Sequence, residues 1–248
     1  MRLAALYDIH ANLPALEAVL EEVRRADVDR IVVGGDVLPG PMPRETLGCL
    51  LDLDLPVQFI YGNGEVAVLE QMAGKEPSQV PELYRPIIRW TAQQLVSEHE
   101  RFLRTWPKTV RLQISGLGDV LFCHATPRNE NECFTRSTPE ERLLAVFAGV
   151  DAAVVVCGHT HMQFDRMVGR IRVVNAGSVG MPFGEPGADW LLLGPDVQLR
   201  HTRYDLADAT ERIRTTSYPQ AQDFAARNVL QPPSAGEMAE AFARVELR

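Results

Sequence analysis

The stretch LAALYDIH at residues 3–10 sets the pattern on which this fold is built, because an apolar run ends there in two potential metal ligands. The same arrangement recurs after the apolar runs at 31–33, 57–61, 120–123 and 152–157. Ligands of open α/β sheets bind beyond the carboxyl ends of the strands. We therefore expect the side chains that end these runs to meet at one place. In chain order they are Asp8, His10, Asp36, Asn63, His124, His159 and His161.

These side chains carry imidazole nitrogens and carboxylate or amide oxygens, which borderline-soft divalent cations accept as ligands. Each motif taken alone has an ordinary explanation, since a single Gly-Gly-Asp is usually only a turn. Gly-His-Thr-His at 158–161 is more specific, because residues i and i+2 of a loop can both face one site. The complete set is large enough for two ions that share a bridging carboxylate. This indicates two-metal hydrolysis of a phosphate ester.

The ordered motifs Asp-x-His, Gly-Asp, Gly-Asn, His and Gly-His-x-His resemble those of the calcineurin-like metallophosphoesterase superfamily. The strings at 8–20, 90–95 and 175–180 are similar to those of its small prokaryotic subgroup, which is related to diadenosine tetraphosphatase and serine/threonine phosphatases. The resemblance covers roughly residues 1–205. It implies an α/β fold, a four-layer α/β/β/α metallophosphoesterase sandwich.

The resemblance also implies an assignment of the ligands, in which Asp36 bridges two metals. The first metal would be held by Asp8, His10, Asp36 and His161, and the second by Asp36, Asn63, His124 and His159. The implied cofactors are two divalent transition-metal ions, drawn from Mn, Fe, Zn, Ni or Co. All seven residues would count as catalytic, because the nucleophile depends on the metals.

One position departs from the family pattern. Many members follow Gly-Asn with His and then an acidic residue, whereas this chain has Gly64 and Glu65. The missing imidazole normally assists the leaving group. We therefore expect an enzyme with less such assistance, best suited to esters whose leaving group has a low pKa, and a pocket left open for a bulkier substrate.

The rest of the chain predicts further elements around this core. Helices are expected at 13–26 and 43–53, a helical insertion at about 64–106, and hairpins between 109 and 203. Amphipathic segments broken by prolines form a C-terminal extension at 206–248, which we interpret as a helical cover packed on the same domain, 1–205.

Composition limits the partners of the protein. Formal net charge is -8, which argues against stable nucleic-acid binding, since that needs clustered Lys and Arg. No apolar run approaches the ~20 residues of a membrane span. The four cysteines form no CxxC pair, and the expected compartment is cytoplasmic. The sequence does not determine the oligomeric state.

Outside the ligand set, Arg128 is the candidate substrate-binding residue, because a guanidinium suits bidentate phosphate recognition. A surface ion pair with Glu130 or Glu132 is the alternative. Asn12 is interpreted as a helix cap. The expected function is hydrolysis of small phosphomonoesters or phosphodiesters, and nucleotides are among the candidate substrates. The alternatives are a protein phosphatase, a dinucleoside polyphosphate hydrolase, a nuclease, and a non-catalytic scaffold of the same fold.

Overall fold

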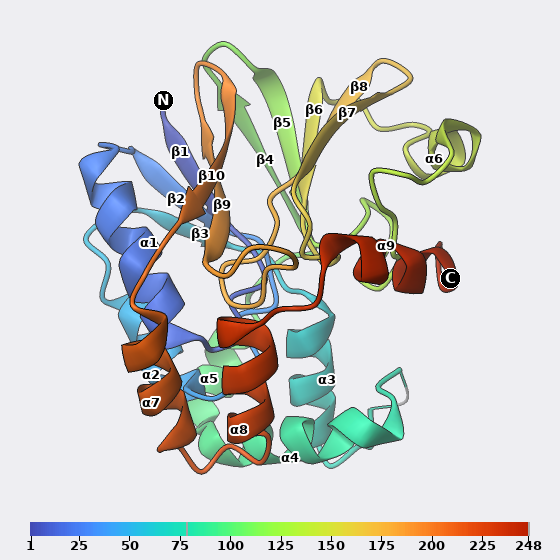
Figure 1. Ribbon diagram of the computed structural model, residues 1–248. Helices are drawn as coiled ribbons and strands as arrows, with labels where there is room; N and C mark the ends of the chain where they lie inside the picture. Colours follow the sequence, from blue (N-terminus) through green and yellow to red (C-terminus); the bar gives the residue numbers. More distant parts are fainter. Residues whose placement is uncertain (78, 248) are drawn as a thin grey trace.

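The computed structural model describes residues 1–77 and 79–247. Two five-stranded sheets pack face to face, and helices cover their outer faces (Figure 1). The predicted four-layer α/β/β/α sandwich is therefore confirmed. Ser78, in the predicted insertion, and Arg248, at the end of the predicted extension, lie outside the described residues.

Each sheet is mixed and combines parallel with antiparallel strand pairs. The first sheet has the order β10 (Val197–Thr202), β9 (Ala188–Leu193), β1 (Leu3–Leu6), β2 (Arg30–Val33) and β3 (Val57–Phe59). The second has the order β4 (Thr109–Ile114), β5 (Gly118–Cys123), β6 (Val154–Cys157), β8 (Ile171–Asn175) and β7 (Phe164–Val168). β1, β2 and β3 are parallel, as are β5, β6 and β8. The carboxyl ends of these strands consequently lie along one edge of the sandwich.

Strand β1 shows how the sequence places one strand between two layers. Successive side chains of a strand point to opposite faces. Leu3 and Ala5 pack with Phe122 and Val156 between the two sheets, whereas Leu6 packs with the helices on the outer face. The all-apolar run LAAL therefore fits a strand that is buried on both sides.

The helices divide into a cover for each sheet, an insertion and a tail. The outer face of the first sheet carries α1 (Leu13–Arg25) and α2 (Pro43–Leu51), and the second carries α6 (Glu140–Val146) (Figure 1). The insertion contains α3 (Asn63–Met72), η1 (Glu82–Tyr84), α4 (Arg85–Gln94) and α5 (Ser97–Leu103). The tail contains α7 (Leu206–Arg214), α8 (Ala221–Phe224), the π-helix η2 (Ala225–Leu230) and α9 (Ala235–Ala243). Both the insertion and the helical tail were predicted.

The tail packs against the insertion rather than standing apart from it. Ile213, Phe224 and Val229 of the tail share one apolar cluster with Ile87 of α4. The two segments, more than a hundred residues apart in sequence, therefore build one wall beyond the carboxyl ends of the strands. None of the described helices is long and apolar enough to cross a membrane.

Candidate metal centre

The side chains that were predicted as ligands converge where the carboxyl ends of the two sheets meet. Asp8 and His10 follow β1, Asp36 follows β2, and His124 follows β5. The loops are held together by backbone hydrogen bonds, including Asp8 N–H to the Gly35 carbonyl and His10 N–H to the Asp36 carbonyl. The register of the parallel strands thus fixes the spacing of the ligands.

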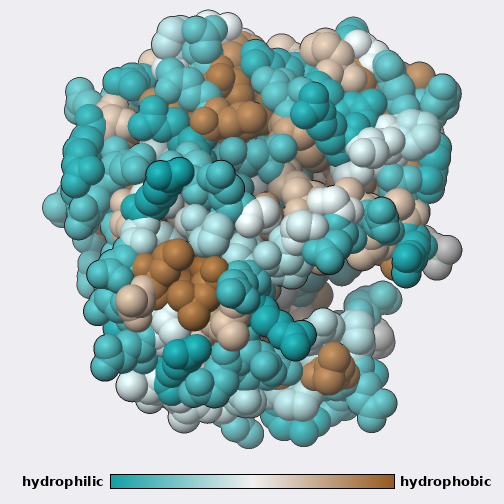
Figure 2. All heavy atoms as spheres, viewed as in Figure 1, coloured by the Kyte–Doolittle hydropathy of each residue, from teal (hydrophilic) through white to brown (hydrophobic). Residues whose placement is uncertain are grey.

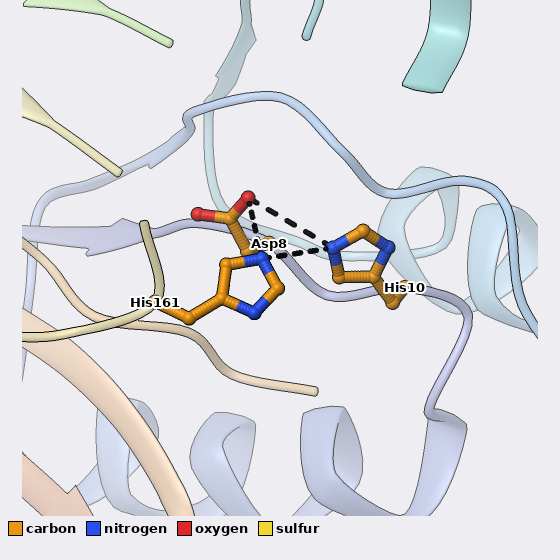
Figure 3. A group of neighbouring side chains, drawn as sticks. All are labelled: Asp8, His10 and His161. Atoms are coloured by element: carbon orange, nitrogen blue, oxygen red, sulfur yellow. Dashed lines mark hydrogen bonds and ion pairs between the residues drawn. The ribbon is translucent and has the colours of Figure 1, made fainter. Parts of the chain in front are cut away.

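Asp8, His10 and His161 form one compact group (Figure 3). Nε2 of His161 lies 3.3 Å from Oδ1 of Asp8 and 3.2 Å from Nε2 of His10. Figure 3 shows both rings turned toward the same carboxylate oxygen. The group brings two imidazoles and one carboxylate from opposite sheets to a single point.

Asp8, Asp36 and His124 form a second group that shares Asp8 with the first. Nε2 of His124 lies 3.6 Å from Oδ1 of Asp36, and Oδ1 of Asn63 lies 3.1 Å from the same nitrogen. The other carboxylate oxygen of Asp36, Oδ2, lies 3.8 Å from Nε2 of His10. Asp36 therefore presents one oxygen to each group, which is the arrangement expected of a bridging ligand.

His159 lies beside these two groups without belonging to either. Its ring centroid is 5.1 Å from that of His124, and its backbone N–H donates to Oδ2 of Asp8 at 2.8 Å. Its Nε2 faces the carbonyl of Asn131 at 3.2 Å, so Nδ1 is the nitrogen left for a metal.

Backbone carbonyls fix the orientation of the other imidazoles. Nδ1 lies 2.9 Å from the Gly34 carbonyl in His124, 2.9 Å from the Met181 carbonyl in His161, and 3.3 Å from the Pro39 carbonyl in His10. A ring nitrogen that donates to a carbonyl leaves Nε2 as the acceptor nitrogen. Metal-binding histidines are typically held in this way.

The environment keeps two of the imidazoles in the form that binds metals. Burial and the neighbouring His161 ring lower the pKa of His10 to about 3. Burial and the neighbouring His124 ring lower the pKa of His159 to about 3. Both rings are therefore neutral at physiological pH and offer a lone pair to a cation.

The buried carboxylates of Asp8 and Asp36, by contrast, have too little positive charge around them to balance both of their negative charges. Burial, and after it the charge of Asp8, raise the pKa of Asp36 well above its ordinary range. Burial also disfavours the charge of Asp8, but His161, His124 and His10 together outweigh it and hold the pKa of Asp8 below its usual value. Oδ1 of Asp8 is buried and accepts no hydrogen bond from the described residues. A divalent cation would supply the missing partner, so the donor set fits metal ions.

Several of these residues have a strained backbone. A non-glycine residue in the left-handed region costs about 1–2 kcal/mol. Such conformations cluster at functional sites, where the surrounding structure holds them. Here they have φ between 47° and 67° and comprise Asp8, His10, Ala11, Asp36, His159 and His161.

Glu65 organises the two loops that follow β2 and β3. It is fully buried, and its carboxylate accepts hydrogen bonds from the backbone N–H groups of Asp36, Leu38 and Gly62 at 2.7–3.0 Å. Burial, and then the charge of Asp36, raise the pKa of Glu65 to about 7. In this chain the acidic position after Gly64 therefore orients the backbone of a ligand loop.

Replacing Glu65 by Gln is expected to lower the free energy of unfolding by about 2 kcal/mol, because an amide NH₂ then faces backbone donors that lose their acceptor. Urea denaturation measures the change. Glu98→Gln is the matched control: that carboxylate is exposed and, among the described residues, pairs with Arg101 alone, so its loss should be nearly neutral. A Glu65→Gln protein as stable as the control would contradict this role.

Gly64 occupies the position where many relatives have a histidine. Its N–H donates to Oδ1 of Asp36 at 2.7 Å. A Cβ at this position would overlap the carbonyl oxygen of Leu38. The glycine is therefore required by the close approach of the loop after β2, in addition to lining the cavity beside the metal centre.

The structure does not bring Arg128 to the other candidate residues. Its guanidinium is half exposed and pairs with Glu132, with Nε 2.9 Å from both carboxylate oxygens. This is the ion pair that the sequence offered as the alternative, and a phosphate contact by Arg128 stays a prediction. Asn12 caps α1 by accepting from the Ala15 N–H, as predicted.

Comparisons with known proteins agree with this geometry. Residues 1–194 match the calcineurin-like phosphoesterase superfamily domain. The chain is 28% identical over 239 residues to an uncharacterised protein of Methanocaldococcus jannaschii, covering 88% of this chain and 94% of that protein. The crystal structure of a metallophosphoesterase from Sphaerobacter thermophilus is similar, with a TM-score of 0.71, 27% identity, and 92% of this chain and 99% of that chain covered.

A second solved structure shows likeness of fold alone. It is that of a hypothetical protein from Pyrococcus horikoshii OT3, with a TM-score of 0.78, 21% identity, and 94% of this chain and 99% of that chain covered. Because the matched family domain spans most of the 248 residues, this protein belongs to the calcineurin-like phosphoesterase superfamily.

Proposed function

We propose that the protein is a dinuclear, metal-dependent phosphoesterase that hydrolyses small phosphomonoesters or phosphodiesters. The observation that carries the proposal is the placement of Asp36, whose two carboxylate oxygens face His10 and His124 in separate ligand groups. Two neighbouring cations need a shared carboxylate of this kind, since they would otherwise repel each other.

Divalent ions bound at such a site act as Lewis acids toward phosphoryl oxygens and lower the pKa of bound water to about 7. The residues of this chain prepare the place for that chemistry. The carboxylates of Asp8 and Asp36 balance the positive charge, and the neutral rings of His10 and His159 donate their lone pairs. The carbonyl acceptors prevent the rings from turning away.

Position 64 restricts the esters that the site can handle well. Gly64 provides no side chain that could give a proton to the leaving group. A positioned proton donor typically contributes about 10²–10⁴-fold to the rate. Aryl esters, whose leaving groups depart without a proton, are therefore the preferred test substrates, ahead of alkyl esters.

Metal content tests the proposal directly. Protein purified without chelator is expected to hold about two transition-metal ions per chain and to hydrolyse p-nitrophenyl phosphate or bis-p-nitrophenyl phosphate. Chelation should abolish hydrolysis and lower Tm, because the buried carboxylates then lose their counter-charge. Adding Mn, Fe, Zn, Ni or Co in turn should restore both.

Elemental analysis measures the metal content, calorimetry measures Tm, and a chromogenic assay measures hydrolysis. A protein that holds no metal and gains no activity with any of the five ions would exclude the proposed phosphoesterase function and favour a non-catalytic scaffold of the same fold.

A further inference from the structure

A cavity of about 570 Å³ opens beside the metal centre. Its lining includes His10, Asp36 and Asn63, and most of the other lining residues come from the insertion and the tail. Figure 2 shows the hollowed surface of this face, between α9 and the helices below it in the view. Pockets of this size bind organic molecules much larger than a phosphate ion.

Part of the lining is apolar and aromatic. It includes Ile87 and Ile88 of α4 and Phe224 of α8. Tyr84, at the end of η1, also lines the cavity although its residue surface is 47% exposed. A half-exposed aromatic ring at a cavity wall is a platform for a planar group, since stacking needs only a π-face.

Arg227 adds a positively charged side chain to the lining of the cavity. It lines the cavity from the π-helix η2, and no carboxylate of the described residues lies within ion-pair distance of its guanidinium. This includes Asp223, which lies about one turn earlier. π-Helical turns occur frequently at functional sites, where they redirect side chains. An unpaired guanidinium in a cavity suits bidentate binding of a phosphate.

Two amides add hydrogen-bonding capacity beside this arginine. Gln220 and Asn228 both line the cavity, and each side chain offers donors and an acceptor. The combination is an aromatic platform, amide groups that can pair with the edge of a heterocycle, and a cation for an anionic group.

We propose that this cavity binds a leaving group that is itself a nucleotide, with its base against Tyr84 and its phosphate at Arg227. Hydrolysis of such a substrate rests on the proposed function. For adenosine 3′,5′-bisphosphate, water would form a bond to the 3′ phosphorus while the bond from phosphorus to the 3′ oxygen breaks. The 3′ oxygen takes up a proton from solvent water, because Gly64 supplies none, and the products are inorganic phosphate and adenosine 5′-monophosphate.

Binding of adenosine 5′-monophosphate, the leaving group of that reaction, tests the pocket without turnover. Isothermal titration calorimetry on the as-purified chain should give a Kd that rises at least ~10-fold in Arg227→Ala, because a charge-assisted hydrogen bond is lost. Tyr84→Ala should raise it at least ~5-fold through loss of stacking. Arg214→Ala is the matched control, since it removes an exposed arginine of the same tail that does not line this cavity.

Two results would contradict the assignment of nucleotide binding to this cavity. One is no measurable binding of adenosine 5′-monophosphate. The other is binding that is the same in Arg227→Ala and in Arg214→Ala, which would place the ligand elsewhere, for example on the metals alone. Circular dichroism spectra and Tm values like those of the parent chain establish that each variant is folded.

Turnover separates the pocket from the metal chemistry. With Mn present, kcat/KM should be at least ~10-fold higher for adenosine 3′,5′-bisphosphate than for adenosine 3′-monophosphate, and Arg227→Ala should remove that preference. In Arg214→Ala, the matched control, both this preference and the hydrolysis of p-nitrophenyl phosphate should equal those of the parent chain. If no ester is hydrolysed while the calorimetry behaves as expected, the proposed function fails and the nucleotide pocket stands. If esters are hydrolysed without the preference, the pocket assignment fails and the proposed function stands.

Discussion

Replacing Asp36 by Ala is expected to lower kcat by about 10³-fold or more on every ester. This is the largest loss of activity that we expect from any of the proposed substitutions. This carboxylate faces both ligand groups, so its removal disturbs two metal positions at once. It also removes the acceptor of the Gly64 N–H. Steady-state kinetics and elemental analysis together should show that activity and metal content fall together.

Asp52→Ala provides the control for this substitution. Asp52 ends α2 on the exposed surface, and its loss should leave metal content and kcat unchanged. An Asp36→Ala protein that keeps both ions and most of its activity would show that the carboxylate is not a bridge. Asp8, which is common to the two compact groups, would then be the better candidate.

Installing the imidazole that many relatives carry, by Gly64→His, is expected to destabilise the protein by about 3 kcal/mol or more rather than to improve catalysis. The added Cβ would overlap the Leu38 carbonyl oxygen, and backbone must move to make room. That movement also pulls the Gly64 N–H away from Asp36. Urea denaturation reports the loss of stability, and kcat on aryl and alkyl esters reports the effect on the site.

Gly48→Ala is the matched control, because a Cβ there meets no atom within 4 Å. In the interior of a helix this change should stabilise the protein by about 0.5–1 kcal/mol. The expectation is wrong if Gly64→His unfolds like the parent chain and accelerates the hydrolysis of alkyl esters, as simple restoration of the family pattern would require.

The sequence predicted the buried strands and the meeting of Asp8, Asp36 and His124 because these features depend on short-range regularities, whereas the four-layer sandwich was implied by the resemblance to the family. Apolar runs identify strands that are buried on both faces, and the residues that end parallel strands share one edge. The capping role of Asn12 is equally local, since it involves the first turn of α1. Such features need no knowledge of distant contacts.

Other features depend on contacts that a single segment does not encode. α6 was not predicted: it has only seven residues, and its Leu143 and Val146 pack on the second sheet. Two of the three hydrogen bonds of Glu65 come from Asp36 and Leu38, which lie 29 and 27 residues away in the sequence. Arg227 lies in a tail interpreted only as a cover, and the sequence contains no signal that its π-helix lines the cavity.

The left-handed backbone of the ligand loops has a consequence for how this protein can change under selection. Glycine would relieve the strain at Asp8, Asp36 or His161, yet it would also remove the ligand. Stability and activity are therefore opposed at these positions. In a lineage that no longer needs catalysis, substitution by glycine would increase the free energy of unfolding. Asp8, Asp36 and His161, with φ near 50°, therefore stand at positions where stability alone would favour glycine.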